Sequence, residues 1–119
     1  MSTPHRPAGI HLLADLAGIE PHLLTDADAI DALLREAALA AGAHILHSHF
    51  HAFGPGMGVT GVLLLAESHI SIHTWPEHGF AAADIFMCGA AQPQRALELI
   101  DAAFQPGSRS VQTIARGQL

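Results

Sequence analysis

The chain has little cysteine, little positive charge and no long apolar run, and each shortage excludes a class of protein. One cysteine in 119 residues leaves no internal disulfide, and residues 1–9 lack the pattern of a signal peptide, so we expect the cytosol. Five basic against eleven acidic residues argue against nucleic acid as a partner. The longest apolar run, within residues 59–66, is far shorter than the roughly 20 residues of a membrane-spanning helix, so no membrane partner is expected.

Charged residues of both signs are also sparse. They make up 13% of the chain, whereas half of the residues are hydrophobic. Residues 1–119 suit one domain with a real core. So few charges leave apolar surface to be covered, which favours a homodimer or a higher homo-oligomer.

Hydrophobic periodicity predicts six strands and two helices. Thr25 is expected to cap the first helix and Gly42 to end it. This order indicates an α+β fold, a two-layer sandwich with two helices on one face of a largely antiparallel sheet. The other face would be free for a homodimer that forms through its sheets. The predicted strands are 9–16, 43–53, 59–66, 70–74, 80–88 and 109–115, and the helices are 26–41 and 92–104.

Histidine is abundant, with ten in the chain. In an extended segment His47, His49 and His51 share one face, and such a stripe can bind a metal ion. No cysteine or carboxylate lies nearby in the sequence to complete the site. We therefore favour a polar strand face, and expect no metal.

The most reactive stretch of the chain follows the predicted strand at residues 59–66. Ser68 could be a nucleophile activated by His69 or His73, with Asp84 or Glu77 orienting the base. Such a site would indicate a hydrolase. However, Ser68 lacks the flanking glycines of a nucleophile elbow.

The single cysteine offers a second possible nucleophile. Cys88 could act with His73 as a thiol–imidazole pair. A lone cysteine in an apolar strand is more often a small buried side chain. The residues alone leave both interpretations open.

Two adjacent segments are more specific than any of these short patterns. Residues 67–77 (ESHISIHTWPE) and 79–89 (GFAAADIFMCG) resemble the signature of the prokaryotic S-adenosylmethionine decarboxylases, which are pyruvoyl enzymes. Residues 9–16 and 59–62 resemble the same family. The resemblance therefore covers most of residues 9–90.

The resemblance implies that the chain cuts itself between Glu67 and Ser68. The products would be a β chain of residues 1–67 and an α chain of residues 68–119, whose first residue becomes a pyruvoyl group. This cofactor, derived from Ser68, would form a Schiff base with the substrate amine. It would then accept the electrons released as carbon dioxide departs.

The same resemblance implies roles for five further residues. His73 would be the base that promotes ester elimination during processing, and Thr60 the hydroxyl residue that assists it. Cys88 would protonate the substrate carbon after decarboxylation, as a thiol that holds its proton at neutral pH. Glu77 would hold the ribose hydroxyls, and Phe53 would stack on adenine.

The implied activity is decarboxylation of S-adenosylmethionine, which supplies the aminopropyl donor for spermidine. Three departures leave the substrate open: Thr60 stands where serine is common, Ile10 stands where many relatives carry a basic residue, and the glycine loop at residues 54–58 lacks a tyrosine often found there. One alternative is an L-ornithine or L-arginine decarboxylase on the same scaffold. Another is a non-catalytic homologue that acts as a binding or regulatory module.

Overall fold

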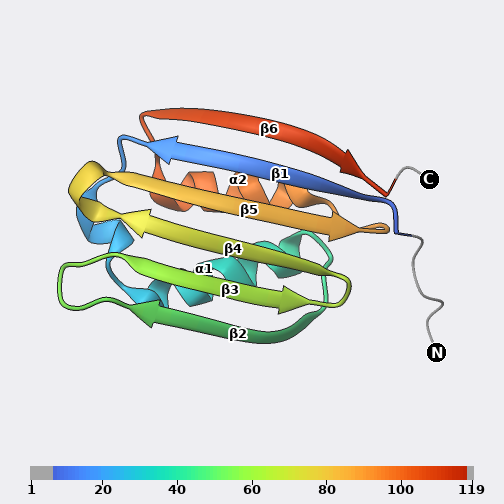
Figure 1. The fold of residues 1–119 in the computed structure, drawn as a ribbon, viewed down its shortest axis with the longest axis horizontal. Coiled ribbons are helices and arrows are strands. Elements are labelled where there is room, and N and C mark those ends of the chain that lie inside the picture. Colours follow the sequence, from blue (N-terminus) through green and yellow to red (C-terminus); the bar gives the residue numbers. More distant parts are fainter. Residues whose placement is uncertain (1–6, 118–119) are drawn as a thin grey trace.

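The computed structural model describes residues 7–117 as two layers, a six-stranded sheet and two helices (Figure 1). Neither helix in this part of the chain is long and apolar enough to cross a membrane. The elements in chain order are β1 (Gly9–Ala17), η1 (Pro21–Leu24), α1 (Ala27–Ala40), β2 (Ile45–Ala52), β3 (Val59–Leu65), β4 (Ser68–Trp75), η2 (Pro76–His78), β5 (Phe80–Cys88), α2 (Pro93–Phe104) and β6 (Ser108–Arg116), where η marks a 3₁₀ helix.

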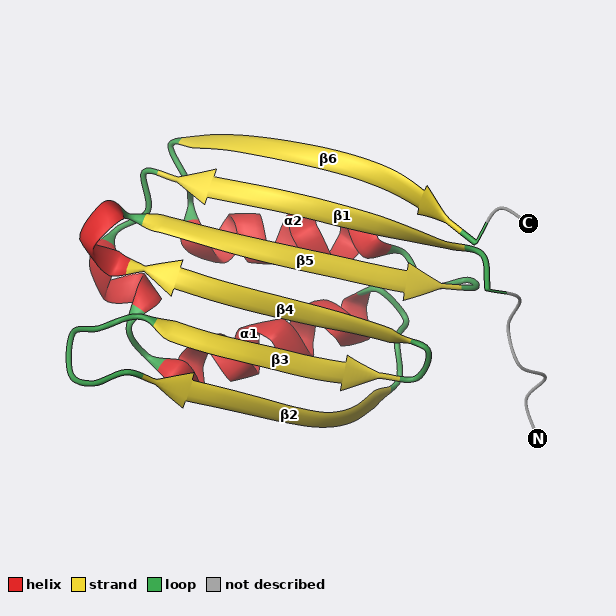
Figure 2. Cartoon of the chain, in the orientation of Figure 1, coloured by secondary structure: helices red, strands yellow, loops and turns green. Residues whose placement is uncertain are grey.

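Every neighbouring pair of strands is antiparallel, in the order β2-β3-β4-β5-β1-β6. Tight connections join β2 through β5 into a meander, and β1 and β6 complete the sheet beside β5. Both helices cover the same face of the sheet (Figure 2). The α+β sandwich expected from the sequence is confirmed.

The core lies between the sheet and the helices. Because side chains alternate across a strand, every second residue of the covered strands faces α1 and α2, and most of these residues are apolar. Burying them removes apolar surface from water, which stabilises the fold by roughly 25 cal/mol per Å². The largest fully buried side chains include Leu12, Leu16, Ile30, Leu34, Leu63, Ile70, Ile72, Ile85, Met87 and Ile100.

Most element boundaries differ from the sequence prediction by one or two residues, and two of the differences, at the starts of α1 and β4, have a clear physical cause. Helix α1 is capped by Asp26, whose side chain accepts a hydrogen bond from the Ala29 amide at 3.1 Å. The Thr25 hydroxyl instead donates to the His22 carbonyl, at 3.4 Å. Strand β4 begins at Ser68, two residues earlier than predicted, because its first residues already pair with β3 and β5. Ser68 is therefore the first residue of a strand.

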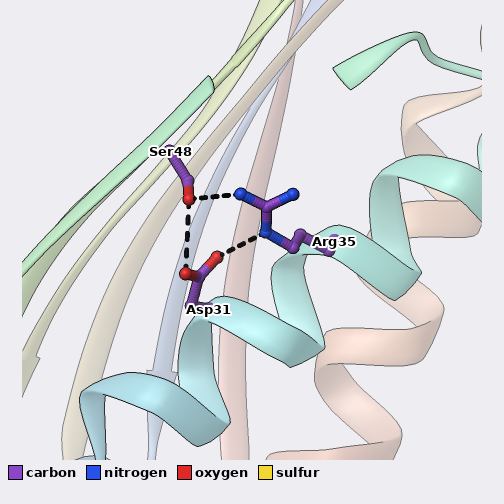
Figure 3. A network of polar contacts seen from close by, with 3 residues as sticks. All are labelled: Asp31, Arg35 and Ser48. Atoms are coloured by element: carbon purple, nitrogen blue, oxygen red, sulfur yellow. Dashed lines mark hydrogen bonds and ion pairs between the residues drawn. The ribbon is translucent and has the colours of Figure 1, made fainter. Parts of the chain in front are cut away.

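A polar network ties the edge strand β2 to helix α1 (Figure 3). Arg35 donates to the Asp31 carboxylate at 3.0 Å and to the Ser48 hydroxyl at 2.7 Å. The Ser48 hydroxyl donates to the other Asp31 oxygen at 3.2 Å. These groups are largely exposed, so the network orients the edge strand more than it stabilises the fold.

The other face of the sheet is not covered by any described element; we call it the open face. Cross-strand partners share a face, so the pairing of His47, His49 and His51 with Leu64, Val62 and Thr60 places all six there. The three histidines do share one face, as predicted. Within residues 7–117, however, no three potential ligands are placed to hold a metal ion.

Candidate active site

The turn between β3 and β4 holds an unusual backbone conformation. Glu67 has φ of +60°, and Gln105 is the only other non-glycine residue with positive φ in residues 7–117. This region is unfavourable for a residue with a β-carbon, at a cost of about 1–3 kcal/mol. Ser68 follows directly, so the predicted cleavage would break the peptide bond that joins the strained Glu67 to Ser68.

The Ser68 hydroxyl lies at the end of β5. It accepts a hydrogen bond from the Cys88 amide at 3.2 Å. Both residues line a small cavity of about 140 Å³. The sequence predicted these two residues for one site, and the structure brings them together. The other residues that line the cavity are Gly42, Ala43, His44, Ala66, Ala90 and Ala91.

The environment of Cys88 favours a protonated thiol. Burial raises the pKa of Cys88, and the neighbouring Glu67 carboxylate raises it further. A free thiol with a raised pKa holds its proton at neutral pH, which suits a proton donor better than a nucleophile. Gly9, paired with Cys88 on β1, leaves room for the sulfur. A β-carbon at Gly9 would lie 3.0 Å from the Cys88 sulfur and 2.7 Å from the Met87 carbonyl oxygen.

A second cluster lies at the opposite end of β4. The Thr60 hydroxyl and the Nδ1 atom of His73 are 3.1 Å apart and form a hydrogen bond. His73 and Thr60 are cross-strand partners, so this contact follows from the register of β3 and β4. The predicted pair of processing residues is therefore assembled by the fold.

This second cluster borders a larger cavity of about 350 Å³. Phe53, predicted to stack on adenine, is 56% exposed and stands in edge contact with His51. Glu77, predicted to hold ribose, lies in the first turn of η2. The complete lining is Phe53, Met57, Gly58, Thr60, His73, Thr74, Trp75 and Glu77.

Four of the lining residues, Trp75 among them, were not predicted from the sequence. The buried Thr74 hydroxyl accepts from the Val59 amide at 2.8 Å and donates to the Leu24 carbonyl at 2.7 Å, so it joins three segments. Gly58 must lack a side chain because a β-carbon would collide with the Thr74 carbonyl. Met57 adds a half-exposed side chain. Only the glycine-rich composition of residues 54–58 hinted at this loop.

The two clusters do not meet within one chain. Ser68 and His73 are five residues apart on a single strand, which corresponds to about 17 Å. Cys88 is separated from the β5 partner of His73, Ala82, by six residues. A Ser68–His73 or Cys88–His73 dyad within one chain is therefore wrong, since a hydrogen bond needs about 3 Å.

His69 does not serve as a base for Ser68 either. Its ring lies on the open face against Phe86 and His11, with ring centroids 5.9 and 6.1 Å away. Burial lowers the pKa of His69, the nearby His11 lowers it further, and Asp84 acts in the opposite direction. His11 has its Nε2 atom buried 3.9 Å from the Asp84 carboxylate. Asp84 therefore lies near His11 and His69 and does not orient a base at Ser68.

Comparison with known proteins places this arrangement in one family. The family model described as S-adenosylmethionine decarboxylase matches residues 10–117. The chain is 43% identical over 110 residues to the S-adenosylmethionine decarboxylase proenzyme of Thermodesulfovibrio yellowstonii, covering 92% of this chain and 81% of the relative. The proenzyme of Persephonella marina is 46% identical over 110 residues, covering 92% and 82%.

A solved structure agrees with the sequence comparisons. The crystal structure of the adenosylmethionine decarboxylase from Aquifex aeolicus superposes with a TM-score of 0.85 and 40% identity, covering 93% of this chain and 92% of that one. The residues that the family model matches, 10–117, include both clusters. The chain belongs to the S-adenosylmethionine decarboxylase family.

Proposed function

We propose that this protein is a self-processing, pyruvoyl-dependent decarboxylase of S-adenosylmethionine that acts in the cytosol. The observation that carries the proposal is the contact between Ser68 and Cys88 directly after the strained Glu67, in a chain of this family. Its product would be the aminopropyl donor for spermidine synthesis.

The residues at the Ser68 end fit a pyruvoyl group formed in place. Strain at Glu67 raises the free energy of the intact turn, so cleavage between residues 67 and 68 relieves it. The Cys88 amide already binds the oxygen of residue 68 and would hold it during attack on the Glu67 carbonyl. Once formed, the pyruvoyl group supplies an electron sink for decarboxylation. The protonated Cys88 thiol then delivers a proton to the substrate carbon.

The residues at the opposite end fit the nucleoside part of the substrate. Phe53 and Trp75 present exposed aromatic surface on which an adenine ring can stack. Glu77 lines the same cavity and can accept hydrogen bonds from two neighbouring ribose hydroxyls. A cavity of about 350 Å³ falls within the usual range for small-molecule sites.

We further propose that two copies pack through their open faces, so that each site takes residues from both. Thr60 and His73 lie on the open face, and the Cys88 sulfur lies beside Gly9 on the same face. A two-fold axis through the middle of β4, near Ser71, would bring His73 of a second copy over Ser68. Exposed Leu64 and Ile114 on this face would then be buried.

Mass spectrometry under denaturing conditions tests the processing step. We expect two chains, residues 1–67 and 68–119, the second without a free amino terminus. Ser68→Ala should remain one intact chain without activity. Decarboxylation by Ser68→Ala would exclude the pyruvoyl mechanism, and an intact wild-type chain would favour the non-catalytic homologue.

Release of labelled carbon dioxide tests the substrate. Purified processed protein is incubated separately with carboxyl-labelled S-adenosylmethionine, L-ornithine and L-arginine. We expect release only from S-adenosylmethionine, because a basic amino acid has no ring to stack on Phe53 and no ribose for Glu77. Release from ornithine or arginine alone would instead assign the alternative activity.

A further inference from the structure

His44 lies at the Ser68 cavity, although neither the sequence patterns nor the proposed mechanism gives it a role. It follows the turn after α1 and precedes β2, and it is exposed. Its carbonyl accepts a hydrogen bond from the Ala66 amide at 2.9 Å. Because Ala66 is two residues before Ser68, this bond fixes His44 beside the predicted cleavage position.

The composition of the cavity makes His44 distinctive. Five of the eight lining residues are glycine or alanine, which offer no charge or side-chain hydrogen bond. Of the remaining three, Ser68, Cys88 and His44, only His44 can carry a positive charge. Glu67 lies close enough to raise the pKa of Cys88, so it is an acidic neighbour of this cavity. An anionic group that enters this cavity therefore finds one possible counter-charge in its lining.

We propose that His44 receives the carboxylate of the substrate and thereby selects an amino acid over an amine that lacks it. The inference rests on the proposed function. An amino acid that reacts through its amine at position 68 carries its carboxylate on the adjacent carbon. That carboxylate must lie within the same small cavity, where His44 can donate a charge-assisted hydrogen bond to it.

The proposal predicts how binding depends on pH. Among the described residues, the titratable groups around the carboxylate are His44, the Cys88 thiol and the Glu67 carboxylate. An imidazole loses its positive charge as pH rises through neutrality, whereas the raised pKa of Cys88 keeps its thiol protonated there. Affinity for the carboxylate-bearing substrate should therefore fall as pH rises through neutrality. Affinity for the same compound without its carboxylate should not fall in this way as pH rises.

Calorimetry measures this difference without turnover. In a Ser68→Ala background, the dissociation constants of S-adenosylmethionine and of its decarboxylated form are compared with and without His44→Gln. We expect S-adenosylmethionine to bind about 5- to 20-fold more weakly, as for loss of a charged hydrogen bond at a partly exposed site. The decarboxylated compound should bind to the His44→Gln variant within about twofold of its original affinity. The control is His22→Gln, at a similarly exposed histidine on η1, and it should bind both ligands within about twofold of their original affinities.

Steady-state kinetics of the processed enzyme provide a second test. His44→Gln should raise KM for S-adenosylmethionine while the cleaved fraction, measured by mass spectrometry, stays unchanged. His44→Arg, a permanent cation, should restore KM and remove its pH dependence. Equal weakening of both ligands, or no weakening of either, would overturn the proposal. If the wild type releases no carbon dioxide, the proposed function fails while the calorimetric comparison still decides the role of His44.

Discussion

The two ends of β4 hold different kinds of chemistry. The Ser68 end has a strained turn, a thiol with a raised pKa and a small cavity, which suit bond breaking. The His73 end has a hydroxyl–imidazole pair, exposed aromatic rings and a larger cavity, which suit binding and proton transfer. About 17 Å of strand separates them. One chain therefore holds two half-sites, and the proposed activity needs both.

Mixing two inactive variants is the strongest test of this separation. Ser68→Ala and His73→Ala should each remain uncleaved when alone. If the halves combine across two copies, co-expression should restore cleavage, and only the chain that carries His73→Ala should be cut. Denaturing mass spectrometry identifies the cut chain by its mass. Cleavage of the His73→Ala chain without its partner would show that His73 is not needed.

Cys88→Ala should separate processing from turnover at the Ser68 end. The chain should still be cleaved, because the amide that binds the Ser68 hydroxyl is retained. Turnover should fall by about 10²- to 10⁴-fold, the usual contribution of a general acid. The wild-type turnover number at saturating substrate should hold through neutral pH and decline only when alkaline pH removes the thiol proton, because the pKa of Cys88 is raised. An unchanged turnover number in Cys88→Ala would exclude Cys88 as the donor.

Thr60→Val should affect processing at the His73 end. It keeps the shape of the side chain but removes the hydroxyl that contacts His73. Loss of one such hydrogen bond, worth about 1 kcal/mol, should slow cleavage roughly fivefold. Thr60→Ser is the matched control and should process at a rate close to the wild type. Time courses on denaturing gels measure the cleavage rate of each variant. Equal cleavage rates for Thr60→Val and Thr60→Ser would show that the hydroxyl has no part in cleavage.

Gly9→Ala should damage the Ser68 end without touching its chemistry. The added carbon meets the Cys88 sulfur and the Met87 carbonyl oxygen at or within 3.0 Å, so β5 must shift. Overpacking of this kind costs about 1–3 kcal/mol. We expect a lower Tm and a larger loss of turnover than of substrate affinity. Gly107→Ala is the control for stability, since a β-carbon at Gly107 would meet only Gly18 atoms, at 3.8 Å or more, and Gly107 does not have a positive φ.

His69, in the middle of the open face, should make a small contribution to the pH dependence of stability. The pKa of His69 is lowered in the folded state, so the unfolded chain binds a proton there more readily. Stability should therefore fall as pH drops through the ordinary histidine range. Tm is measured at pH 7.5 and at pH 5 for both proteins. The drop in Tm between these two pH values should be smaller in His69→Gln than in the wild type, by a few degrees. Equal pH dependence in both proteins would contradict the assignment.

Much of the fold could be predicted from local patterns, and the exceptions have physical causes. The strands and helices follow hydrophobic periodicity, and β5 matches its predicted bounds. The cap of α1 was placed on Thr25 instead of Asp26 because both residue types cap helices well and they are adjacent. The two 3₁₀ helices were missed because three or four residues carry too little periodic signal.

The sequence predicted which residues belong to the candidate site but not how they are arranged in space. The family resemblance selected Ser68, Cys88, Thr60 and His73, and the register of the sheet then decided which of them touch. His44 was not predicted, because it belongs to no motif and the backbone bond to Ala66, far along the chain, brings it to the cavity.

The sequence by itself determined the two-layer fold, the family and the residues able to do chemistry, because these depend on local patterns of side chains. The tertiary structure decided that Glu67 is strained, that Ser68 meets Cys88, and that His73 lies a strand's length away. Those facts depend on strand register, which brings together residues far apart in the chain and keeps apart residues only five positions from one another.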